Sequence, residues 1–422
     1  MSLTAEEEET LLRYCTINGK IPAPYAKQLI NYDISDPNSE KFLVYCVWED
    51  YRTKNSYHNC IAKNSDFYLS VTKKYSLNDL KSSIRHFTKE DPNQYGWHID
   101  KMNKNYNKIK SNLLSIEDKK ACALALSYYT GFKDNSDRDN RNVNVLIRGE
   151  NLLTKVNNWN DGNQFYPVLY YTSLAIANLP FYWGYTIRCV QMNNKVANYY
   201  QPGTVITWLK YSSSKIGKEP AHSFSKRNTW FLIYSFNSRE ISQFSVYSEE
   251  KEALYSPFSS FLVFKKISQN GKNLIYMRQI EIGLYVNNIV WVDDNILNSD
   301  WENKGLMEMA YSIKRDLKII PKITTECALA FLISFRPFLR DKKIKYKIMS
   351  DMNRNNEPQS HNAGARLVKY MQENNLYDIE IMIFTSSSDK AIEEMKKLGV
   401  QFNKYIKVTT SSSEALKYLI SS

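Results

Sequence analysis

The stretch Ser245-Val-Tyr-Ser-Glu-Glu-Lys-Glu-Ala-Leu-Tyr-Ser-Pro-Phe-Ser-Ser-Phe-Leu-Val263 places two carboxylates, Glu250 and Glu252, one residue apart just before an apolar strand. In extended backbone, side chains two residues apart point to the same face. We therefore expect both acids to act on neighbouring parts of one ligand, one stabilising a developing positive charge and the other addressing the attacking group. Taken alone, the pair also fits a solvated acidic turn, because charged residues are mostly exposed.

Strand-like segments surround this acidic pair. After Pro180 the apolar residues approach a period of two, and four segments are typical of strands: 186–191, 204–208, 229–234 and 261–264. Before Pro180 the pattern is helical, with Leu77, Leu80 and Ile84 recurring at helical spacing. Helices followed by strands predict an α+β domain, which we assign to residues 76–284.

One helix in this first half has recognisable ends. Ser115 and Asp118 are typical of a variant capping box at its start, and Gly131 is a natural stop at its end. The polar run Asp134–Asn142 that follows predicts a loop.

From Asn288 the order changes to strands and helices in alternation. The strand candidates are 289–292, 319–320, 346–349, 379–384 and 405–408. Such alternation predicts an α/β domain, a doubly wound parallel sheet with helices on both faces, over residues 287–422. Residues 1–75 stay unassigned, although they contain a helical pattern near Glu9–Cys15 and a strand-like Phe42–Trp48.

Composition limits the class of protein. A chain of 422 residues suggests two or three domains, and the 43% of apolar residues can fill their cores. The formal net charge of +12 comes from dispersed Lys and Arg, so a basic surface is favoured over nucleic-acid binding. The six cysteines form no CxxC pair, which favours reduced thiols. The acidic N-terminus and the lack of a long apolar segment predict a cytoplasmic protein without a membrane span.

Two further pieces belong with the acidic pair. Arg188 lies inside an apolar strand, where a guanidinium needs an anionic partner such as an internal carboxylate or the diphosphate of a ligand. The run Ser212-Ser-Ser214 follows a strand and is expected to offer hydroxyls in a turn. The alternative for Arg188 is an arginine at a sheet edge whose guanidinium reaches water. The alternative for the three serines is an ordinary serine-rich turn.

In this order, the pieces resemble the arginine-specific mono-ADP-ribosyltransferases, whose signature is Arg, then aromatic-x-Ser-Thr-Ser, then Glu-x-Glu. The resemblance covers most of residues 76–284. It also includes the segments Leu114–Glu117, Tyr128–Gly131, Asn144–Arg148, Tyr170–Pro180, Gly203–Trp208, Ile241–Ser245 and Glu252–Pro257.

The resemblance implies an enzyme that transfers ADP-ribose from NAD to an exposed arginine of an acceptor protein. It implies that Arg188 braces the site and the NAD phosphate, and that Ser213 orients the catalytic Glu252. Glu250 is implied to position the acceptor guanidinium. Ser214 and Phe224 complete the implied NAD-binding set, with Phe224 stacking on nicotinamide.

Two positions depart from the family pattern. Cys189 follows the first arginine where the family often has Gly, and Lys215 ends the serine motif where a hydroxyl is usual. Two alternatives therefore stay open beside the transferase: an NAD glycohydrolase, in which water accepts the ribosyl group, and a non-catalytic signalling adaptor. Glu250 favours transfer, because hydrolysis needs no residue to prepare a guanidinium.

A second group of polar residues lies in the C-terminal domain. Asp293 and Asp294 end its first strand, Asp351 ends its third and Thr385 its fourth. Because the carboxyl ends of parallel strands converge, the three carboxylates are expected to hold a divalent cation, with the hydroxyl nearby. Acidic loop ends that only cap helices are the alternative.

The strings Ile289–Asp294, Ile348–Met352 and Met382–Ser386 resemble response-regulator receiver domains over residues 287–422. The resemblance implies that Asp351 is the phosphoacceptor, that Asp293, Asp294 and Asp351 bind Mg²⁺, and that Thr385 is the switch hydroxyl. It also implies a partner protein for this domain, either a kinase that donates the phosphoryl group or a docking partner. Thr409 occupies the place of the usual lysine, with Lys407 nearby.

Overall fold

The computed structural model describes residues 74–131, 162–281, 286–334 and 344–421, with short gaps at 90, 193, 199, 203–204, 209–210, 246 and 258, and also residues 4–5, 43–48, 51–56 and 339. The helical pattern expected near Glu9–Cys15, the expected loop Asp134–Asn142 and the segment Asn144–Arg148 lie outside the described residues.

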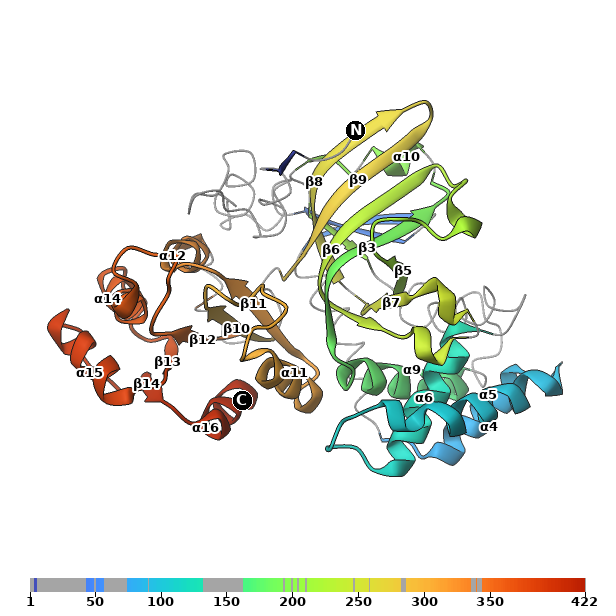
Figure 1. Cartoon of the computed structure of the whole chain (residues 1–422), viewed down its shortest axis with the longest axis horizontal. Helices are drawn as coiled ribbons and strands as arrows, with labels where there is room; N and C mark the ends of the chain where they lie inside the picture. The colour runs from blue at the N-terminus through green and yellow to red at the C-terminus, as the bar shows by residue number, and fades with distance from the viewer. Residues whose placement is uncertain are drawn as a thin grey trace.

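The described residues between Ser76 and Pro180 are mainly helical, as predicted. Its main helices are α4 (Leu77–Phe87), α5 (Pro92–Asn105), α6 (Ile116–Thr130) and α9 (Gly162–Ala177), which gather at one end of the sheet (Figure 1). Ser115 caps α6 by accepting a hydrogen bond from the Asp118 amide, and Gly131 ends the helix at a φ of 82°. Among the described residues, no helix has both the length and the apolar character that a bilayer crossing requires.

A mixed sheet follows the helices. The order of its nine described strands is β2 (Tyr51–Ser56), β1 (Leu43–Trp48), β4 (Val205–Trp208), β8 (Ser259–Gln269), β9 (Lys272–Ile280), β6 (Thr229–Glu240), β3 (Phe181–Val190), β5 (Ser212–Ile216) and β7 (Glu252–Tyr255). This confirms the predicted order of helices before a mixed β core. Strands β1 and β2 come from the segment that the sequence left unassigned, and β1 extends the sheet by pairing with β4.

The strand β5 corrects one expectation. Ser212-Ser-Ser214 was expected in a turn, but all three serines lie in β5, between β3 on one side and β7 on the other. The short strand β7 also pairs with the end of β6, through Arg239 opposite Leu254 and Glu240 opposite Ala253. Strands β3, β5, β7 and β6 therefore form a closed ring, which fixes the start of β7 at Glu252.

The second sheet is parallel and five-stranded. Its order is β11 (Leu317–Lys322), β10 (Asn287–Val292), β12 (Lys345–Asp351), β13 (Glu380–Phe384) and β14 (Ile406–Thr409). Counted within this domain, the strand order is 2-1-3-4-5, as in flavodoxin-like doubly wound folds. The predicted alternation of strands and helices thus produces the predicted parallel sheet.

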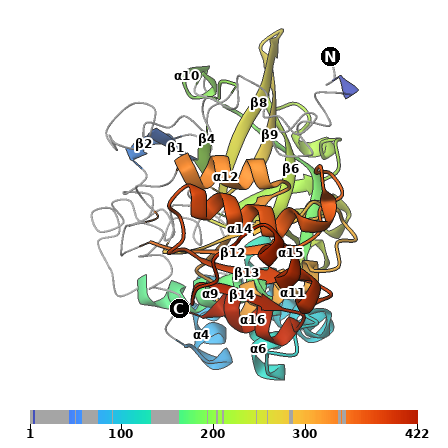
Figure 2. The ribbon, with the colours of Figure 1, turned by 90° about the vertical axis from the view of Figure 1, so that its left-hand side faces the viewer.

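Helices cover both faces of this sheet (Figure 2). They are α11 (Lys304–Ile313), α12 (Thr325–Ser334), α14 (Ala363–Glu373), α15 (Ser388–Lys397) and α16 (Ser412–Ile420). Side chains of β10 alternate between the two apolar layers: Val290 and Val292 pack with α12 and α14, whereas Ile289 and Trp291 pack with α11 and α16. A strand buried on both faces reads as a continuous apolar run, which is the pattern of 289–292.

The two sheets meet through aromatic packing. Phe181, at the start of β3, packs edge-on against Tyr311 of α11, and its amide donates to Glu308 at 2.7 Å. Trp183 of β3 stacks on Trp301, which lies between β10 and α11, at a centroid distance of 6.2 Å. These rings belong to one buried cluster that contains residues of both domains, so the boundary between the domains is a packed interface.

Gly364 provides a test of the packing of α14 on β12. A methyl group added at Gly364 would lie 2.7 Å from the Asp351 carbonyl oxygen and 3.0 Å from the Met352 Cα. We expect Gly364→Ala to lower stability by about 1–3 kcal/mol, measured by thermal unfolding, because backbone atoms cannot move away cheaply. Gly305→Ala in α11 meets no atom within 4 Å and should leave the unfolding temperature unchanged or higher. Equal unfolding temperatures for the two variants would contradict the close contact.

Candidate active site

Arg188 of β3 connects two strands. Its Nη1 donates a hydrogen bond to the carbonyl oxygen of Ser213 on β5, and its guanidinium carbon lies 5.7 Å from the centroid of the Trp208 ring. Burial, and secondarily the charge of Arg227, lower the pKa of Arg188 to about 10, so the side chain stays cationic at neutral pH. Tyr200 and Glu252 act in the opposite direction and raise the pKa of Arg188, so Glu252 is a nearby carboxylate of the kind that the sequence required.

Ser213 connects Arg188 to the acid. In the antiparallel pairing of β5 with β7, Ser213 lies opposite Leu254 and Lys215 lies opposite Glu252. The Ser213 hydroxyl makes a side-chain hydrogen bond to the Glu252 carboxylate. One serine therefore holds both functional groups, because its carbonyl accepts from the cation and its hydroxyl bonds to the acid.

Ser214 does not join this site. Side chains alternate along β5, and the Ser214 hydroxyl points to the opposite side, where it donates to the Ala253 carbonyl at 3.3 Å. The predicted role of Ser214 in NAD binding therefore has no support in the structure, and Ser214 instead reinforces the β5–β7 pairing.

The two departures from the family pattern leave the site open. Cys189 points away from Arg188, into a buried cluster with Ile187 and Leu232. The Lys215 ammonium donates to the carbonyl of Glu219 at 3.0 Å, outside the bond between Ser213 and the acid. Neither residue obstructs the contact between Arg188, Ser213 and Glu252.

Glu252 is a partly buried acid with a strongly perturbed ionisation. Burial raises the pKa of Glu252 to about 7, and the nearby charge of Glu250 acts in the same direction. The Ser213 hydrogen bond and Arg188 act in the opposite direction but do not cancel the burial. An acid whose pKa is raised to near neutrality beside a specific charged group is a candidate catalytic group.

Glu250 reaches the site from a different element. It ends the short 3-10 helix η6 (Ser248–Glu250), and Lys251 then adopts a left-handed conformation with φ 47° and ψ 57° before β7 begins. The expectation that Glu250 and Glu252 share one face of extended backbone was therefore wrong. The two carboxylates come close because the chain turns at Lys251, whose carbonyl accepts from the Ile216 amide at 2.9 Å.

Phe224 lies away from the acids. It belongs to the short helix η4 (His222–Phe224) and packs against the cluster that contains Cys189, on the face of β3 opposite Arg188. The predicted stacking of Phe224 on nicotinamide therefore has no support from this arrangement. Arg227 was missed by the sequence reasoning: its guanidinium lies 4.3 Å from the Phe224 ring centroid and donates to the Cys189 carbonyl at 2.9 Å.

Together these groups can stabilise opposite charges at one place. Arg188 stays cationic at neutral pH, and a guanidinium suits a diphosphate. Glu252, when ionised, can stabilise a cation that forms beside it. Glu250 has a pKa raised by burial, which suits a group that accepts a proton from an attacking atom.

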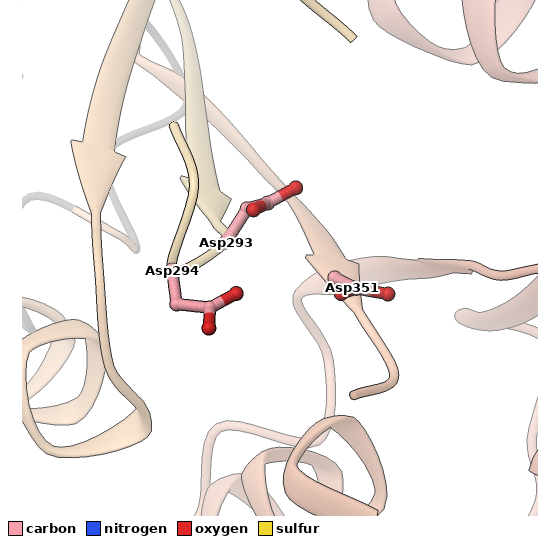
Figure 3. Close-up of side chains that lie close together, drawn as sticks. All are labelled: Asp293, Asp294 and Asp351. Atoms are coloured by element: carbon pink, nitrogen blue, oxygen red, sulfur yellow. The ribbon is translucent and has the colours of Figure 1, made fainter. Parts of the chain in front are cut away.

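A second group of acids lies in the other domain. Oxygen atoms of Asp293, Asp294 and Asp351 lie within 4.8 Å of one another at the ends of β10 and β12 (Figure 3). Burial raises the pKa of Asp351 to about 7, and the charge of Asp293 contributes to the rise. Crowded carboxylate oxygens are the ligand set that Mg²⁺ and related hard cations prefer, so these residues fit such an ion.

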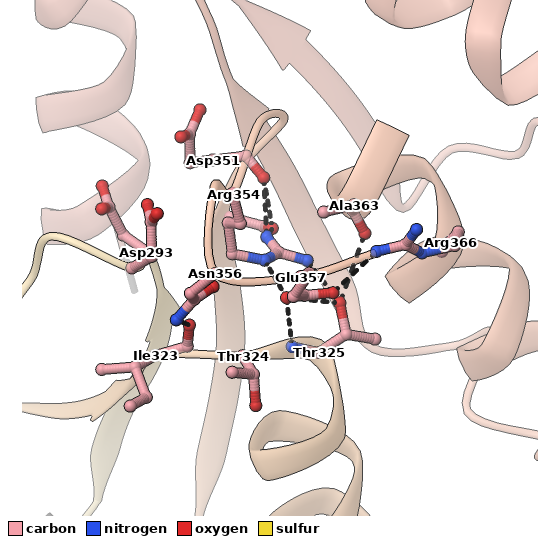
Figure 4. A network of polar contacts seen from close by, with 12 residues as sticks. Asp293, Ile323, Thr324, Thr325, Asp351, Arg354, Asn356, Glu357, Ala363 and Arg366 are labelled. Carbon is pink, nitrogen blue, oxygen red and sulfur yellow. Dashed lines mark hydrogen bonds and ion pairs between the residues drawn. The ribbon is translucent and has the colours of Figure 1, made fainter. Parts of the chain in front are cut away.

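The loop after Asp351 is fixed by a buried arginine (Figure 4). The Arg354 guanidinium is fully buried and donates to the Asp351 carbonyl and the Ser350 hydroxyl, both at 2.8 Å, and to the Thr325 hydroxyl. It also pairs with Glu357 at 2.5 Å. Arg354 therefore contacts the backbone of Asp351, whereas the Asp351 carboxylate stays with the other two acids.

The remaining predicted groups of this domain have other partners. The Thr385 hydroxyl lies 3.4 Å from the Ser387 amide, directly after β13. Thr409, in the place of the usual lysine, is buried and donates to Glu414. Lys407 forms an ion pair with Glu380 at 3.7 Å. Neither Thr409 nor Lys407 brings an ammonium to the three aspartates.

The predicted family resemblance is confirmed for most of the first domain. Residues 77–282 match the family described as NAD:arginine ADP-ribosyltransferase. This range contains Arg188, Ser213, Glu250 and Glu252, and it supports both the predicted enzyme class and NAD as its substrate. For residues 287–422, the resemblance to receiver domains stays a prediction.

Individual proteins show a more distant similarity. A protein of Mycobacterium avium (strain 104) named "Putative NAD(+)--arginine ADP-ribosyltransferase Mav" is 35% identical over 106 residues, which are 24% of this chain and 13% of that protein. The type III effector XopAI of Xanthomonas axonopodis pv. citri has a TM-score of 0.38 at 17% identity, over 53% of this chain and 90% of its own. For HopU1 of Pseudomonas syringae pv. tomato DC3000 the TM-score is 0.31 at 17% identity, over 52% and 97%.

The ionisation of Glu252 predicts a pH dependence of stability. The folded state raises its pKa from 4.5 to about 7 and therefore binds a proton more tightly than the unfolded chain does. This contribution is fully present below pH 4.5 and is lost as the pH rises through 7. We expect the unfolding temperature of the wild type to fall relative to that of Glu252→Gln across this range.

Glu249→Gln is the matched control, because Glu249 is exposed in the same turn. The difference in unfolding temperature between Glu249→Gln and the wild type should change little with pH. If the difference in unfolding temperature between Glu252→Gln and the wild type were equally independent of pH, the Glu252 carboxyl group would be solvated. The burial of this acid would then be ruled out.

Proposed function

We propose that this protein transfers ADP-ribose from NAD to an arginine side chain of an acceptor protein, with release of nicotinamide. The observation that carries the proposal is the joint contact of Arg188, Ser213 and Glu252, within the segment that matches the arginine-specific family. Glu250 in the adjoining turn supplies the second acid that arginine transfer requires.

The reaction breaks the bond between the ribose C1' atom and the nicotinamide nitrogen. The bonding electron pair leaves with nicotinamide, which becomes neutral, and the ribose develops an oxocarbenium-like positive charge. The ionised Glu252 stabilises that charge, because it lies in a partly buried site where electrostatic interactions are stronger than in water. Arg188 is suited to hold the diphosphate.

The acceptor arginine completes the reaction. One of its terminal nitrogens attacks C1' and forms the new bond, and the guanidinium loses one proton. Glu250 is suited to take that proton, because burial and the charge of Glu249 raise its pKa above the ordinary value for glutamate. Hydrolysis by water needs no such group, so the presence of Glu250 beside Glu252 favours transfer over NAD hydrolysis.

For the C-terminal domain we propose Mg²⁺ binding by Asp293, Asp294 and Asp351, and transfer of a phosphoryl group to Asp351 from a kinase or a small phosphodonor. The support is the convergence of the three carboxylates at the ends of neighbouring parallel strands. The cation would offset the burial and the charge of Asp293, which together raise the pKa of Asp351. Thr385, at the end of β13, is the proposed switch hydroxyl, and regulation or partner docking is the proposed role of the domain.

The separate roles proposed for Glu252 and Glu250 can be tested with labelled NAD and either agmatine or arginine-containing peptides as acceptors. Glu252→Gln should lower both transfer and NAD hydrolysis by at least about 100-fold, because it removes the charge that stabilises the ribose cation. Glu250→Gln should lower transfer by about 100-fold, since it removes the proton acceptor, and should leave hydrolysis without acceptor near the wild-type rate.

The exposed Glu373 of α14, outside the site, supplies the control, and Glu373→Gln should keep both activities. Release of free ADP-ribose without labelled acceptor would replace transfer by hydrolysis as the function. If the wild type consumed no NAD, the adaptor hypothesis would be favoured.

The proposed cation site predicts a change in stability. Excess MgCl₂ should raise the unfolding temperature of the wild type, because a ligand that binds only the folded state stabilises it by about 2.7 kcal/mol at 100 times its Kd. Asp351→Asn should abolish most of this rise, whereas Asp389→Asn, at an exposed position on α15, should keep it.

With acetyl phosphate and Mg²⁺, the intact mass should increase by one phosphoryl group in the wild type but not in Asp351→Asn. An unchanged mass of the wild type would remove the phosphoacceptor role.

A further inference from the structure

A cavity lies beside the turn that carries Glu250. Its volume is about 300 Å³, and its wall includes Trp97, Lys101, Lys104 and Lys108 from α5 and the 3-10 helix η2 (Tyr106–Lys108) that follows. The lining also includes Ser248, the first residue of η6. The cavity is therefore bounded by the same three-residue helix that ends at Glu250, and it adjoins the place where the acceptor arginine is expected.

The turn is attached to the lysine-bearing helix. The Lys101 ammonium donates to the carbonyl oxygen of Ser245 at 3.0 Å and lies 5.3 Å from the centroid of the Trp97 ring. Lys101 thus fixes one edge of the cavity. Lys104 and Lys108 are exposed, and within the described part of the chain they form no ion pair.

The cavity carries an excess of positive charge. Three lysines line it, against one aspartate, Asp100. The lysines are close enough to repel one another: burial is the main cause that lowers the pKa of Lys101, and the charges of Lys108 and Lys104 lower it further. A ligand with carboxylates would relieve this repulsion.

We propose that this cavity binds an acidic segment of the acceptor protein, so that the enzyme selects arginines with carboxylates nearby in the acceptor chain. The proposal rests on the transferase function above. Ser248 lines the cavity and Glu250 lies two residues further along the same short helix, so a single extended stretch of acceptor can reach both at about 3.3 Å per residue.

The size and lining of the cavity favour a protein segment over nucleic acid. A nucleic-acid backbone is read by a basic groove or stripe that follows many phosphates. Here the three lysines surround one cavity of about 300 Å³, which suits a short segment of chain better than a continuous row of phosphates. Trp97 adds a half-buried ring that an aliphatic part of a peptide can contact.

The first test uses two synthetic peptides that contain one arginine, flanked a few residues away either by glutamates or by glutamines. At low salt, wild-type kcat/KM should be about tenfold higher for the acidic peptide, and the advantage should shrink at high salt. In Lys104→Glu/Lys108→Glu the ratio should fall to about one or below, because like charges now meet. Transfer to agmatine, which has no acidic flank, should stay at the wild-type rate.

The matched control is Lys390→Glu/Lys396→Glu on α15, where both lysines are exposed and the change in net charge is the same. This variant should keep the preference for the acidic peptide. Equal kcat/KM for both peptides in the wild type, or a preference that survives in Lys104→Glu/Lys108→Glu, would overturn the proposal while leaving the transferase function intact.

A binding experiment separates failure of this proposal from failure of the proposed function. Fluorescence anisotropy of a labelled acidic peptide needs no catalysis: it should rise with the wild type and with the α15 variant, and should not rise with Lys104→Glu/Lys108→Glu. Absence of binding to the wild type would refute the acidic-segment site. Binding of a single-stranded oligonucleotide of equal charge in place of the peptide would assign the surface to nucleic acid. An inactive wild type that still binds the peptide would refute only the transferase function.

Discussion

The hydrogen bond from Arg188 to the Ser213 carbonyl is the interaction on which the rest of the active site depends. A guanidinium inside a sheet has to be satisfied, and here a backbone oxygen of the neighbouring strand does so. That oxygen belongs to the residue whose hydroxyl holds Glu252. A shift of β5 by one residue would turn the Ser213 hydroxyl to the other face of the sheet and separate the acid from the cation. The closed ring of β3, β5, β7 and β6 resists such a shift, because β7 pairs on both of its sides.

A single tryptophan connects the acidic cluster of the second domain to the sheet of the first. Trp301 donates from Nε1 to the Asp293 carboxylate at 2.8 Å, and its ring stacks on Trp183 of β3, the strand that also carries Arg188. Trp301 is buried, so it cannot reorient without disturbing both neighbours. Asp293 therefore has a double role in the structure, as one of three clustered acids and as a partner in the interface.

Much of this organisation could be predicted from the sequence, because the signals were local. The cap at Ser115 and the stop at Gly131 define α6, and the uninterrupted apolar run 289–292 requires a strand buried on both faces. The strand β5 could not be predicted in this way. Its serines and lysine have little intrinsic preference for a strand, and pairing with β3 and β7 imposes the extended backbone. The lysine cavity likewise had no sequence signal, because it forms only where α5 approaches the turn before Glu250.

The left-handed conformation of Lys251 has a consequence for how such a domain can change over evolutionary time. Glu252 is held by strand pairing and by Ser213, whereas Glu250 belongs to a separate short helix on the other side of Lys251. Substitutions at Ser248 and Glu249 can therefore alter the surface offered to a partner while the strand that holds Glu252 keeps its register. Selection for a new target and selection for NAD chemistry fall on different residues, so a lineage can acquire new targets without rebuilding its catalytic centre.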